Sequence, residues 1–400
     1  MIDLRIQDPS RDRYHSLAIS SVWELPRIRA ANVLVVGAGA LGNEVSKNLA
    51  MMGVRSIAIL DRDTVEVSNL SRSVFFRESD HGRPKTEVLR DRLKELNPDV
   101  EIVTLTGDLN AVLGLGLLRR MDMVFSCLDS RIARRSLNRM CEKVGKWWVD
   151  GSMENLLGSV SVFTPSNGPC YECTLTKAEL AVIAEAVSCR GVALKNIAMG
   201  KVPTTPTMGS ITAALQVQEG MKMLHGDVTR SLAGKRLVIN GGDNDFYVTQ
   251  SSRMEACQGH FRFGDVTEIS DFSAANTSAR TILGIFKKQT GVDGALDLGR
   301  EIVIEIRCGT CDTLEVLGEP VRTMTQDKVR CSKCGNPRHL VTTHTIRGDE
   351  VYSEWPLVRL GIPRFDVLEV KGQASRAWYE LTGDIAGFPV GVESAAGSAS

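Results

Sequence analysis

Residues 32–42 read Asn-Val-Leu-Val-Val-Gly-Ala-Gly-Ala-Leu-Gly. The apolar, β-branched run that opens this stretch predicts a buried parallel strand, and a helical pattern follows the glycines from Asn43 to Met52. Gly37, Gly39 and Gly42 therefore form G-x-G-x-x-G between a strand and a helix. Such a loop lets the backbone approach a phosphate at the helix N-terminus, where free N–H groups and the helix dipole favour anions. The stretch predicts nucleotide binding.

Strands and helices alternate on the C-terminal side of this loop, and the alternation predicts a doubly wound, mostly parallel α/β sheet. Further strands are expected at Ser56 to Leu60, Glu101 to Leu105, Met123 to Ser126 and Trp147 to Val149, and helices at Lys85 to Leu96, Leu113 to Arg120 and Ile132 to Val144. Beyond them, residues 151–164 have strand character, 209–224 form an amphipathic helix, and 235–240 and 245–250 resemble paired strands. No internal repeat is visible.

The composition argues against nucleic-acid-binding and membrane proteins. The 400 residues contain 48 Lys plus Arg and 48 Asp plus Glu, so no global field recruits nucleic acid or an anionic membrane. No apolar stretch is long enough to predict a transmembrane helix, and the N-terminal residues Met1 to Ser16 contain no apolar signal core. We expect a cytoplasmic protein without nucleic-acid or membrane partners, whose 10 cysteines stay reduced.

A charged segment follows the second strand. Asp61, at the end of that strand, is placed to bond the hydroxyls of a ribose. The chain continues through Asp63 and Asn69 to Arg72, so two carboxylates, an amide and a guanidinium lie within 12 residues. A glycine loop alone would suggest a dehydrogenase, but this cluster of charged and amide side chains is not typical of one.

Two more charged residues lie near predicted strand ends or helix starts. Lys85 begins a helix, where a cation opposes the helix dipole unless an anion is bound nearby. Asp129 follows the fourth strand. Because the carboxyl ends of parallel strands face one crevice, Asp61, Arg72, Lys85 and Asp129 are expected to converge there. Two cations with carboxylates suit a triphosphate with Mg²⁺ better than a nicotinamide.

In this order the residues resemble the adenylating family of ubiquitin-activating enzymes and their bacterial relatives ThiF and MoeB. The family pattern is a glycine loop, then D-x-D-x-V-x-x-S-N-L-x-R, then G-x-x-K, then an Asp after the fourth strand. Cys170-Tyr-Glu-Cys173-Thr-Leu resembles the family's first zinc pair, and Thr207-Met-Gly-Ser-Ile with Ala214 to Leu224 resembles its closing helix. The resemblance covers about residues 13–262.

The resemblance implies an activity and a role for each matching residue. In the family, the C-terminal glycine carboxylate of a carrier protein attacks the α-phosphate of ATP, and an acyl-adenylate and pyrophosphate result. By position, Asp61 holds the ribose, Asn69 positions the triphosphate, Arg72 and Lys85 stabilise phosphate charge, and Asp129 holds Mg²⁺. The implied nucleotide-binding set is Gly37, Gly39, Gly42, Asp61, Asp63, Asn69, Arg72, Lys85 and Asp129.

The sequence departs from the family near its N-terminus. Relatives carry R-Y-x-R, whose second arginine reaches the phosphates of a neighbouring subunit, whereas this chain reads Arg13-Tyr14-His15-Ser16. Either Arg11 or Arg13 substitutes, or the contact is missing. The resemblance implies a homodimer, although a heteromeric partner could supply the arginine.

Six cysteines form three C-x-x-C pairs, which in a reducing compartment indicate zinc before a redox dithiol. Cys308, Cys311, Cys331 and Cys334 have the spacing of a structural zinc ribbon. The resemblance implies a second structural zinc on Cys170 and Cys173, closed here by Cys257 and His260 instead of another C-x-x-C. The competing grouping joins Cys170 and Cys173 to one distal pair.

Cys189 lies where relatives carry the cysteine that accepts the acyl group from the adenylate, and Arg190 beside it favours the thiolate. The alternative is an incidental loop cysteine. Cys127 and Cys141 are expected to be core residues. The catalytic set implied by the resemblance is Cys189, Arg72, Lys85 and Asp129.

The expected domains follow from these motifs. They are a helical leader at 1–30, an ATP-binding adenylation domain with the first zinc site at 31–262, a β-rich zinc-ribbon domain at 263–385, and a disordered Gly/Ala/Ser-rich tail at 386–400. The third of these resembles no family closely, and its mixed charge favours protein docking, for example of a conjugating enzyme, over nucleic-acid binding.

The leading hypothesis is activation of a small ubiquitin-like β-grasp protein that ends in glycine, followed by thioester formation and transfer to a conjugating enzyme. Bacterial relatives of this build occur in operons that encode such proteins. The first alternative is activation of a sulfur carrier for thiamin or molybdopterin synthesis. Others are adenylation of a free peptide or a tRNA base, a nicotinamide-dependent oxidoreductase, and a non-catalytic zinc scaffold.

Overall fold

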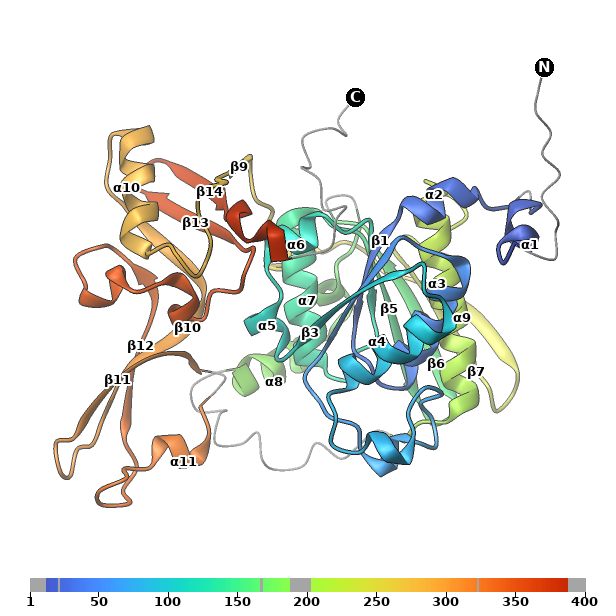
Figure 1. The fold of residues 1–400 in the computed structure, drawn as a ribbon, viewed down its shortest axis with the longest axis horizontal. Coiled ribbons are helices and arrows are strands. Elements are labelled where there is room, and N and C mark those ends of the chain that lie inside the picture. The colour runs from blue at the N-terminus through green and yellow to red at the C-terminus, as the bar shows by residue number, and fades with distance from the viewer. Residues whose placement is uncertain (1–11, 21, 166–167, 188–202, 322–323, 388–400) are drawn as a thin grey trace.

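The computed structural model describes residues 12–20, 22–165, 168–187, 203–321 and 324–387, and these form two β-sheets (Figure 1). The first sheet has eight strands in the order β3-β2-β1-β4-β5-β6-β7-β8. Its strands are β1 (Asn32–Val36), β2 (Ser56–Asp61), β3 (Glu101–Thr106), β4 (Met123–Ser126), β5 (Trp148–Glu154), β6 (Leu157–Phe163), β7 (Lys235–Asn240) and β8 (Asp245–Gln250).

The five strands from β3 to β5 are parallel and the last three run antiparallel, so the prediction of a doubly wound, mostly parallel sheet is confirmed. All five residues of β1 are buried, as the apolar run of a central strand requires. The strand order reverses between β1 and β4, which makes their carboxyl ends the switch point where ligands bind in such folds.

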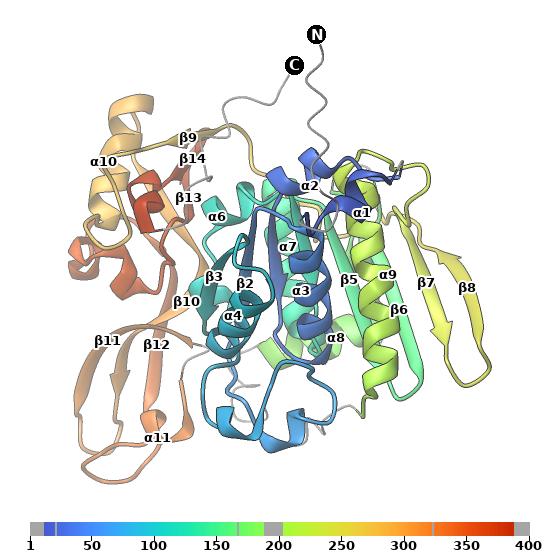
Figure 2. The ribbon, with the colours of Figure 1, turned by 45° about the vertical axis from the view of Figure 1, so that its right-hand side comes forward.

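Helices cover both faces of this sheet (Figure 2). The apolar sides of α2, α3, α4 and α9 pack on one face, and those of α5, α6 and α7 pack on the other. The helices are α1 (His15–Ala18), α2 (Leu25–Ala30), α3 (Ala40–Met52), α4 (Lys85–Leu96), α5 (Leu109–Val112), α6 (Leu115–Arg119), α7 (Arg131–Val144), α8 (Lys177–Val187) and α9 (Pro206–Leu224). None of the described helices is long and apolar enough to cross a membrane.

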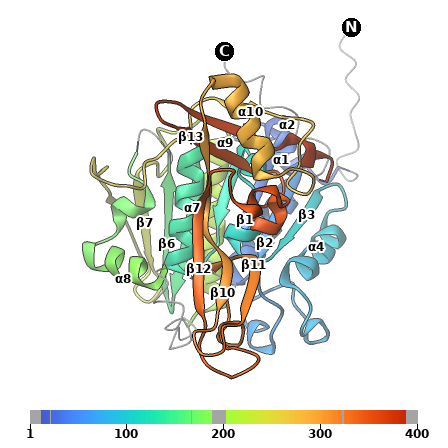
Figure 3. The ribbon, with the colours of Figure 1, turned by 90° about the vertical axis from the view of Figure 1, so that its left-hand side faces the viewer.

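The second sheet contains β9 (Val266–Glu268), β10 (Gly294–Arg307), β11 (Leu314–Pro320), β12 (His339–Ile346), β13 (Val367–Gly372) and β14 (Arg376–Glu380). Their order is β11-β10-β13-β14-β9, and β12 also pairs with β10. The strands β10, β11 and β12 extend as an arm beside the first sheet in Figure 1, and in Figure 3 this arm faces the viewer. Two helices accompany this sheet, α10 (Ala279–Thr290) and α11 (Gln326–Val329).

The described part of the expected helical leader contains two short helices, α1 and α2. Some other helices were not predicted. The expected helix at 113–120 is present as α6, whereas the short helix α5 before it was not predicted. The turn between α5 and α6 packs against Phe365, whose carbonyl accepts from the Gly116 N–H at 3.0 Å. The helix α10 was not predicted, although Ile282 and Phe286 on its apolar side are fully buried.

Charged side chains join the second sheet to the helices of the first. Glu380 on β14 is fully buried and accepts from Arg119 and Arg120 at the end of α6. Arg120 also pairs with Glu268 on β9 at 3.2 Å. The Leu115 N–H donates to Asp366 Oδ1 at 2.9 Å. A buried charge that loses its partner is costly, so these contacts hold the two sheets together.

Candidate functional site

The glycine loop lies at the switch point and touches the end of β4. Gly37 has φ +102°, and a Cβ there would lie 2.5 Å from the carbonyl oxygen of Cys127. A Cβ on Gly42 would lie 1.8 Å from the Gly37 oxygen. Only glycine fits at both positions, because a side chain at either one would collide with backbone that cannot move aside.

Gly39 differs, because a Cβ there would meet no atom within 4 Å. It is the N-cap residue of α3, and the first turn of a helix has N–H groups without partners inside the helix. The face of the loop at Gly39 is therefore open where helix N–H groups converge. These features fit a phosphate group, which the dipole of α3 would also favour.

Asp61 fastens the end of β2 to the glycine loop. Its Oδ2 accepts from the Ala38 N–H at 2.6 Å, and its Oδ1 accepts from the Asp63 N–H at 2.8 Å. Burial raises the pKa of this carboxyl, while the nearby ammonium of Lys85 and the two N–H donors act in the opposite direction. The carboxylate predicted to hold a ribose therefore also orders the loop.

Lys85 and Asp63 form the contact that brings the charged segment to the loop. Lys85 Nζ lies 3.2 Å from Asp63 Oδ2, and the Lys85 side chain is only 11% exposed. The Lys85 N–H also donates to the Asp63 carbonyl at 3.0 Å. Lys85 is the first residue of α4, where the dipole disfavours a cation, so the site holds a positive charge that an anion would stabilise further.

The structure does not join the remaining predicted residues to this pair. Asn69 is buried, and its Oδ1 accepts from the Glu66 N–H at 3.0 Å. Arg72 is half-buried, and its guanidinium donates to the Ser68 carbonyl at 2.6 Å. Asp129 is exposed just beyond β4. Within the described part of the chain, no hydrogen bond or ion pair links Arg72 or Asp129 to Lys85.

Asn43 is a site residue that the sequence analysis missed. Its Nδ2 donates to the carbonyls of Ala38 and Gly39 at 2.9 and 3.0 Å, and its Oδ1 accepts from the Phe75 N–H at 3.1 Å. The side chain is fully buried. It therefore ties the glycine loop to the segment that follows Arg72. A buried amide directly after the third glycine was the available signal.

We expect Asn43→Ala to lower both stability and nucleotide affinity. The substitution removes the side-chain partner of the Ala38 carbonyl and of the Phe75 N–H, at a cost of about 1–3 kcal/mol in unfolding free energy, whereas the Gly39 carbonyl still accepts from the backbone N–H of residue 43 at 2.9 Å. Denaturant unfolding and calorimetric titration with ATP measure the two effects. Ser46→Ala is the matched control, because Ser46 Oγ is buried on the same helix and has no hydrogen-bond partner among the described residues. Equal ATP affinity in Asn43→Ala and Ser46→Ala would contradict the assigned role.

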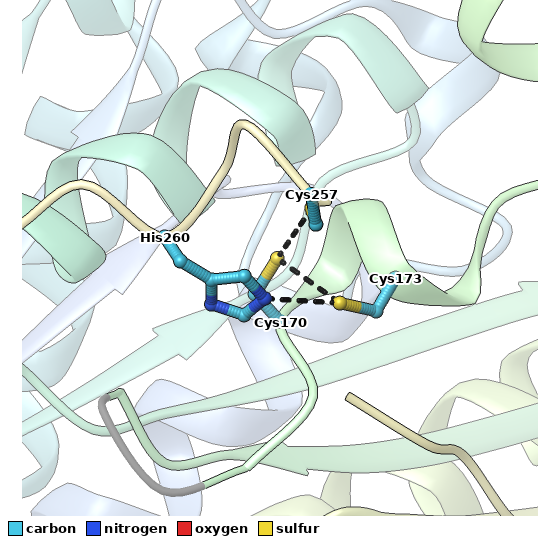
Figure 4. Close-up of side chains that lie close together, drawn as sticks. All are labelled: Cys170, Cys173, Cys257 and His260. Atoms are coloured by element: carbon cyan, nitrogen blue, oxygen red, sulfur yellow. Dashed lines mark hydrogen bonds between the residues drawn. The ribbon is translucent and has the colours of Figure 1, made fainter. Parts of the chain in front are cut away.

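The first cysteine cluster brings Cys170, Cys173, Cys257 and His260 together (Figure 4). Cys170 Sγ is 3.9 Å from Cys173 Sγ and 3.7 Å from Cys257 Sγ, and His260 Nε2 is 3.1 Å from Cys173 Sγ. These cysteines are free thiols. Sulfur atoms bound to one tetrahedral zinc at 2.3 Å would be separated by about 3.8 Å. The set predicted from the resemblance is thus brought together, and it could hold zinc.

A carboxylate lies behind the histidine of this cluster. Glu142 Oε2 is 3.7 Å from His260 Nδ1, and burial raises the pKa of Glu142 to about 7. A carboxylate on the far nitrogen of a histidine is the usual arrangement around a zinc ligand. Glu172, between the two knuckle cysteines, accepts from Arg135 and Arg139 of α7 and anchors the cluster to that helix.

The second cysteine cluster lies in the arm, in the segments that follow β10 and precede β12. Cys308 Sγ is 3.5 Å from Cys334 Sγ, and Cys311 Sγ is 3.5 Å from Cys331 Sγ. Backbone N–H donors lower the pKa of the Cys308 thiol, and a Thr313 hydroxyl with two further N–H donors lowers that of Cys331 to about 5. These donors favour the thiolates that zinc requires, so this predicted set could also hold zinc.

The other predicted residues are distributed as follows. Cys189 lies outside the described residues. Cys141 is fully buried in the core, and Cys127 is half-buried under the glycine loop. Arg13 donates to the Leu96 carbonyl at 3.0 Å, at the end of α4 opposite Lys85. Within its own chain, Arg13 therefore does not approach the glycine loop.

Fold and site together define a doubly wound α/β protein that binds a nucleotide at a glycine loop, with a charged segment and a helix-start lysine beside it. The chain belongs to the ThiF family, whose model matches residues 14–259. This family comprises ThiF/MoeB-type adenylyltransferases that use ATP, and it includes activators of ubiquitin-like proteins as well as enzymes of molybdopterin synthesis.

Known relatives cover different shares of the chain. The molybdopterin-synthase adenylyltransferase of Escherichia coli is 30% identical over 240 residues, 58% of this chain and 87% of that enzyme. Subunit 2 of the SUMO-activating enzyme of Dictyostelium discoideum is 34% identical over 148 residues, 37% of this chain and 22% of that subunit. The adenylyltransferase and sulfurtransferase MOCS3 of Culex quinquefasciatus is 35% identical over 223 residues, 55% of this chain and 47% of that protein. The chain thus spans less than half the length of the last two.

A solved structure shows the same fold. Escherichia coli MccB with MccA-N7isoASN matches with a TM-score of 0.50 at 23% identity, over 59% of this chain and 69% of that chain. The family match ends at residue 259, before β9.

Proposed function

We propose that this chain uses ATP and Mg²⁺ to adenylate the C-terminal glycine of a small ubiquitin-like β-grasp protein, and then carries that protein as a thioester. The observation that supports this most directly is the contact of Lys85 with Asp63 beside the open glycine loop. A largely buried cation near Asp61 and the helix N–H groups at the glycine loop suit a triphosphate. One relative is the ubiquitin-like modifier-activating enzyme 5 of Arabidopsis thaliana, which is 28% identical over 57% of this chain.

The proposed chemistry has two steps. A carboxylate oxygen of the carrier's last glycine attacks the α-phosphorus of ATP, the bond to pyrophosphate breaks, and an acyl-adenylate forms. The Cys189 thiolate then attacks the activated carbonyl and AMP leaves. Lys85 and Arg72 stabilise phosphate charge, Asn69 and Asp63 order the segment that carries them, and Asp61 serves the ribose. Mg²⁺ offsets phosphate charge, and Asp129 offers it an exposed carboxylate at the end of β4.

The remaining parts of the proposal concern organisation. Residues 31–262 form the adenylation domain, and residues 263–385 form a zinc-ribbon domain that docks a conjugating enzyme. Each cysteine cluster holds one structural zinc, because neither leaves a ligand position open. The chain acts in the cytoplasm as a homodimer. Arg11 or Arg13 takes the role of the arginine that relatives carry at the position of Ser16.

The deciding experiment mixes the protein with ATP, Mg²⁺ and a β-grasp carrier ending in glycine, and measures intact mass without reductant. We expect an ATP-dependent adduct that thiol removes. In Cys189→Ala the adduct should disappear while carrier-dependent pyrophosphate exchange continues, because adenylation precedes thiolate attack. Cys141→Ala is the control that retains the adduct, since Cys141 is buried away from the loop. An adduct that persists in Cys189→Ala would refute the assignment.

A sulfur-carrier activator is the second candidate. It is favoured by the match that covers 87% of the Escherichia coli molybdopterin-synthase enzyme. The same experiment separates the two: release of AMP and pyrophosphate without a thiol-sensitive adduct, and with a thiocarboxylate product, would indicate sulfur-carrier chemistry.

A further inference from the structure

One buried arginine outside the predicted site contacts the backbone just before Asp129. Arg134 lies on α7, and its side chain is 11% exposed. Its Nη2 donates to the carbonyl of Leu128, which belongs to the peptide bond that leads into Asp129. The orientation of that peptide therefore depends on a guanidinium that belongs to a different element.

The same guanidinium connects two adjacent strands, β4 and β5. Arg134 Nε donates to Asp150 Oδ1 at 3.1 Å, and Nη2 donates to the Gly151 carbonyl at 3.4 Å. Asp150 Oδ1 also accepts from Ser126 Oγ, the last residue of β4, at 2.7 Å. Arg134 thus binds the loop after β4 and the middle of β5 at once, as the planar fork of arginine allows and an ammonium does not.

A side chain from the other face of the sheet also contacts β4 and β5. Gln216 on α9 is fully buried, and its Nε2 donates to the carbonyls of Ser126 and Val149 at 2.8 and 3.0 Å. The hydroxyl of Tyr171, from the first zinc knuckle, is another neighbour of Arg134. The end of β4 and the middle of β5 are therefore held by Gln216 from one face and by Arg134 from the other, and Arg134 also holds the peptide before Asp129.

We propose that Arg134 is a positioning residue that sets the Asp129 carboxylate for the Mg²⁺ of the bound nucleotide. The proposal rests on the proposed function, in which Asp129 serves that ion. Asp129 suits a hard cation, because its carboxylate is exposed and follows Cys127, whose carbonyl oxygen lies against the glycine loop. Arg134 touches neither nucleotide nor metal, and acts only through the Leu128 carbonyl.

The test measures metal binding directly. Mn²⁺ is titrated into the full chain with a non-hydrolysable ATP analogue, and free Mn²⁺ is followed by EPR. Arg134→Lys keeps a cation opposite Asp150 but loses the fork, so we expect Mn²⁺ affinity to fall by about tenfold or more, as for other residues that orient a metal ligand. Analogue affinity without metal should stay unchanged. Arg135→Lys is the matched control, because Arg135 pairs with Glu172 at 3.0 Å on the same helix.

The outcomes distinguish the two proposals. If the unaltered chain binds no Mn²⁺–nucleotide, the proposed function fails. If it binds and Arg134→Lys binds equally well, the positioning role is wrong. Should Arg134→Lys fail to fold, Arg134→Gln with Asp150→Asn removes both charges together, and the same comparison applies. Equal losses of Mn²⁺–nucleotide and of metal-free analogue affinity would indicate a purely structural role and overturn the proposal.

Discussion

Lys85→Ala is expected to slow carrier-dependent ATP–pyrophosphate exchange by about 10²–10³-fold, the size of effect that follows removal of one charge-stabilising donor from an active site. In the proposed function its ammonium faces the charge that develops when pyrophosphate leaves. The loss should appear in kcat more than in KM for ATP, because the charge is greatest in the transition state.

Stability should change little in the same variant. The substitution removes an ion pair with Asp63, whose side chain is 56% exposed, and such pairs contribute about 0–1 kcal/mol. It also removes a cation from the first turn of α4, which offsets the loss by about 0.3–1 kcal/mol. Lys85→Ala should therefore lower the exchange rate strongly while leaving the free energy of unfolding nearly unchanged.

The control for Lys85→Ala is Lys94→Ala. Lys94 lies on the same helix, near the opposite end, where its Nζ donates to the Pro98 carbonyl. Its exchange rate should match that of the unaltered chain. A Lys85→Ala enzyme with an exchange rate within a few-fold of Lys94→Ala would remove Lys85 from the mechanism.

Loss of zinc from the second cluster should unfold the arm while the first sheet remains intact. Among the residues that the structure describes, the arm's own core consists of the buried apolar residues Val303, Ile306, Val321 and Met324. So small a core cannot offset the entropy of ordering three strands, whereas structural zinc in comparable small domains contributes about 10–16 kcal/mol of apparent binding free energy. Cys331→Ser should therefore expose the arm to protease.

Metal analysis and ATP binding provide the comparison. The unaltered chain should contain two zinc ions, and Cys331→Ser and Cys257→Ser should each contain one. Cys331→Ser should bind ATP normally, because its cluster lies on the second sheet. Cys257→Ser should be less stable, since its cluster connects to α7 through Glu172. One zinc in the unaltered chain would rule out the two-site scheme.

Much of the site could be located from the sequence, because its geometry is local. A β-branched run, a glycine loop and a helical pattern define the strand, turn and helix around Gly37 and Gly42, and the confirmed sheet follows from their alternation. Asp61 and Lys85 fall near the loop for the same reason, since each begins or ends a regular element. The helix α10 was not predicted because the sequence on both sides of it favours β-strands, and its burial depends on tertiary contacts.

The orientation of side chains within the site could not be predicted in this way. Arg72 was expected to converge with Lys85, but it bonds Ser68 on its own segment. The role of Asn43 depends on where residues 73–76 pass over the loop. Spacing along the chain indicates which end of a strand a residue occupies, but it does not determine which backbone group that residue will contact.

The sequence by itself determined the class of fold, the family and the residues of the second zinc set, because glycine-loop and C-x-x-C spacings impose short-range geometry on the backbone. Only the tertiary structure decided between the two groupings left open for Cys170 and Cys173, by placing them beside Cys257 and His260. It alone revealed that Arg134 supports the peptide before Asp129. Those contacts join segments that the packing of α7 and the register of the sheet bring together. The packing and the register depend on burying apolar faces that are far apart in the chain, so no local sequence pattern encodes these contacts.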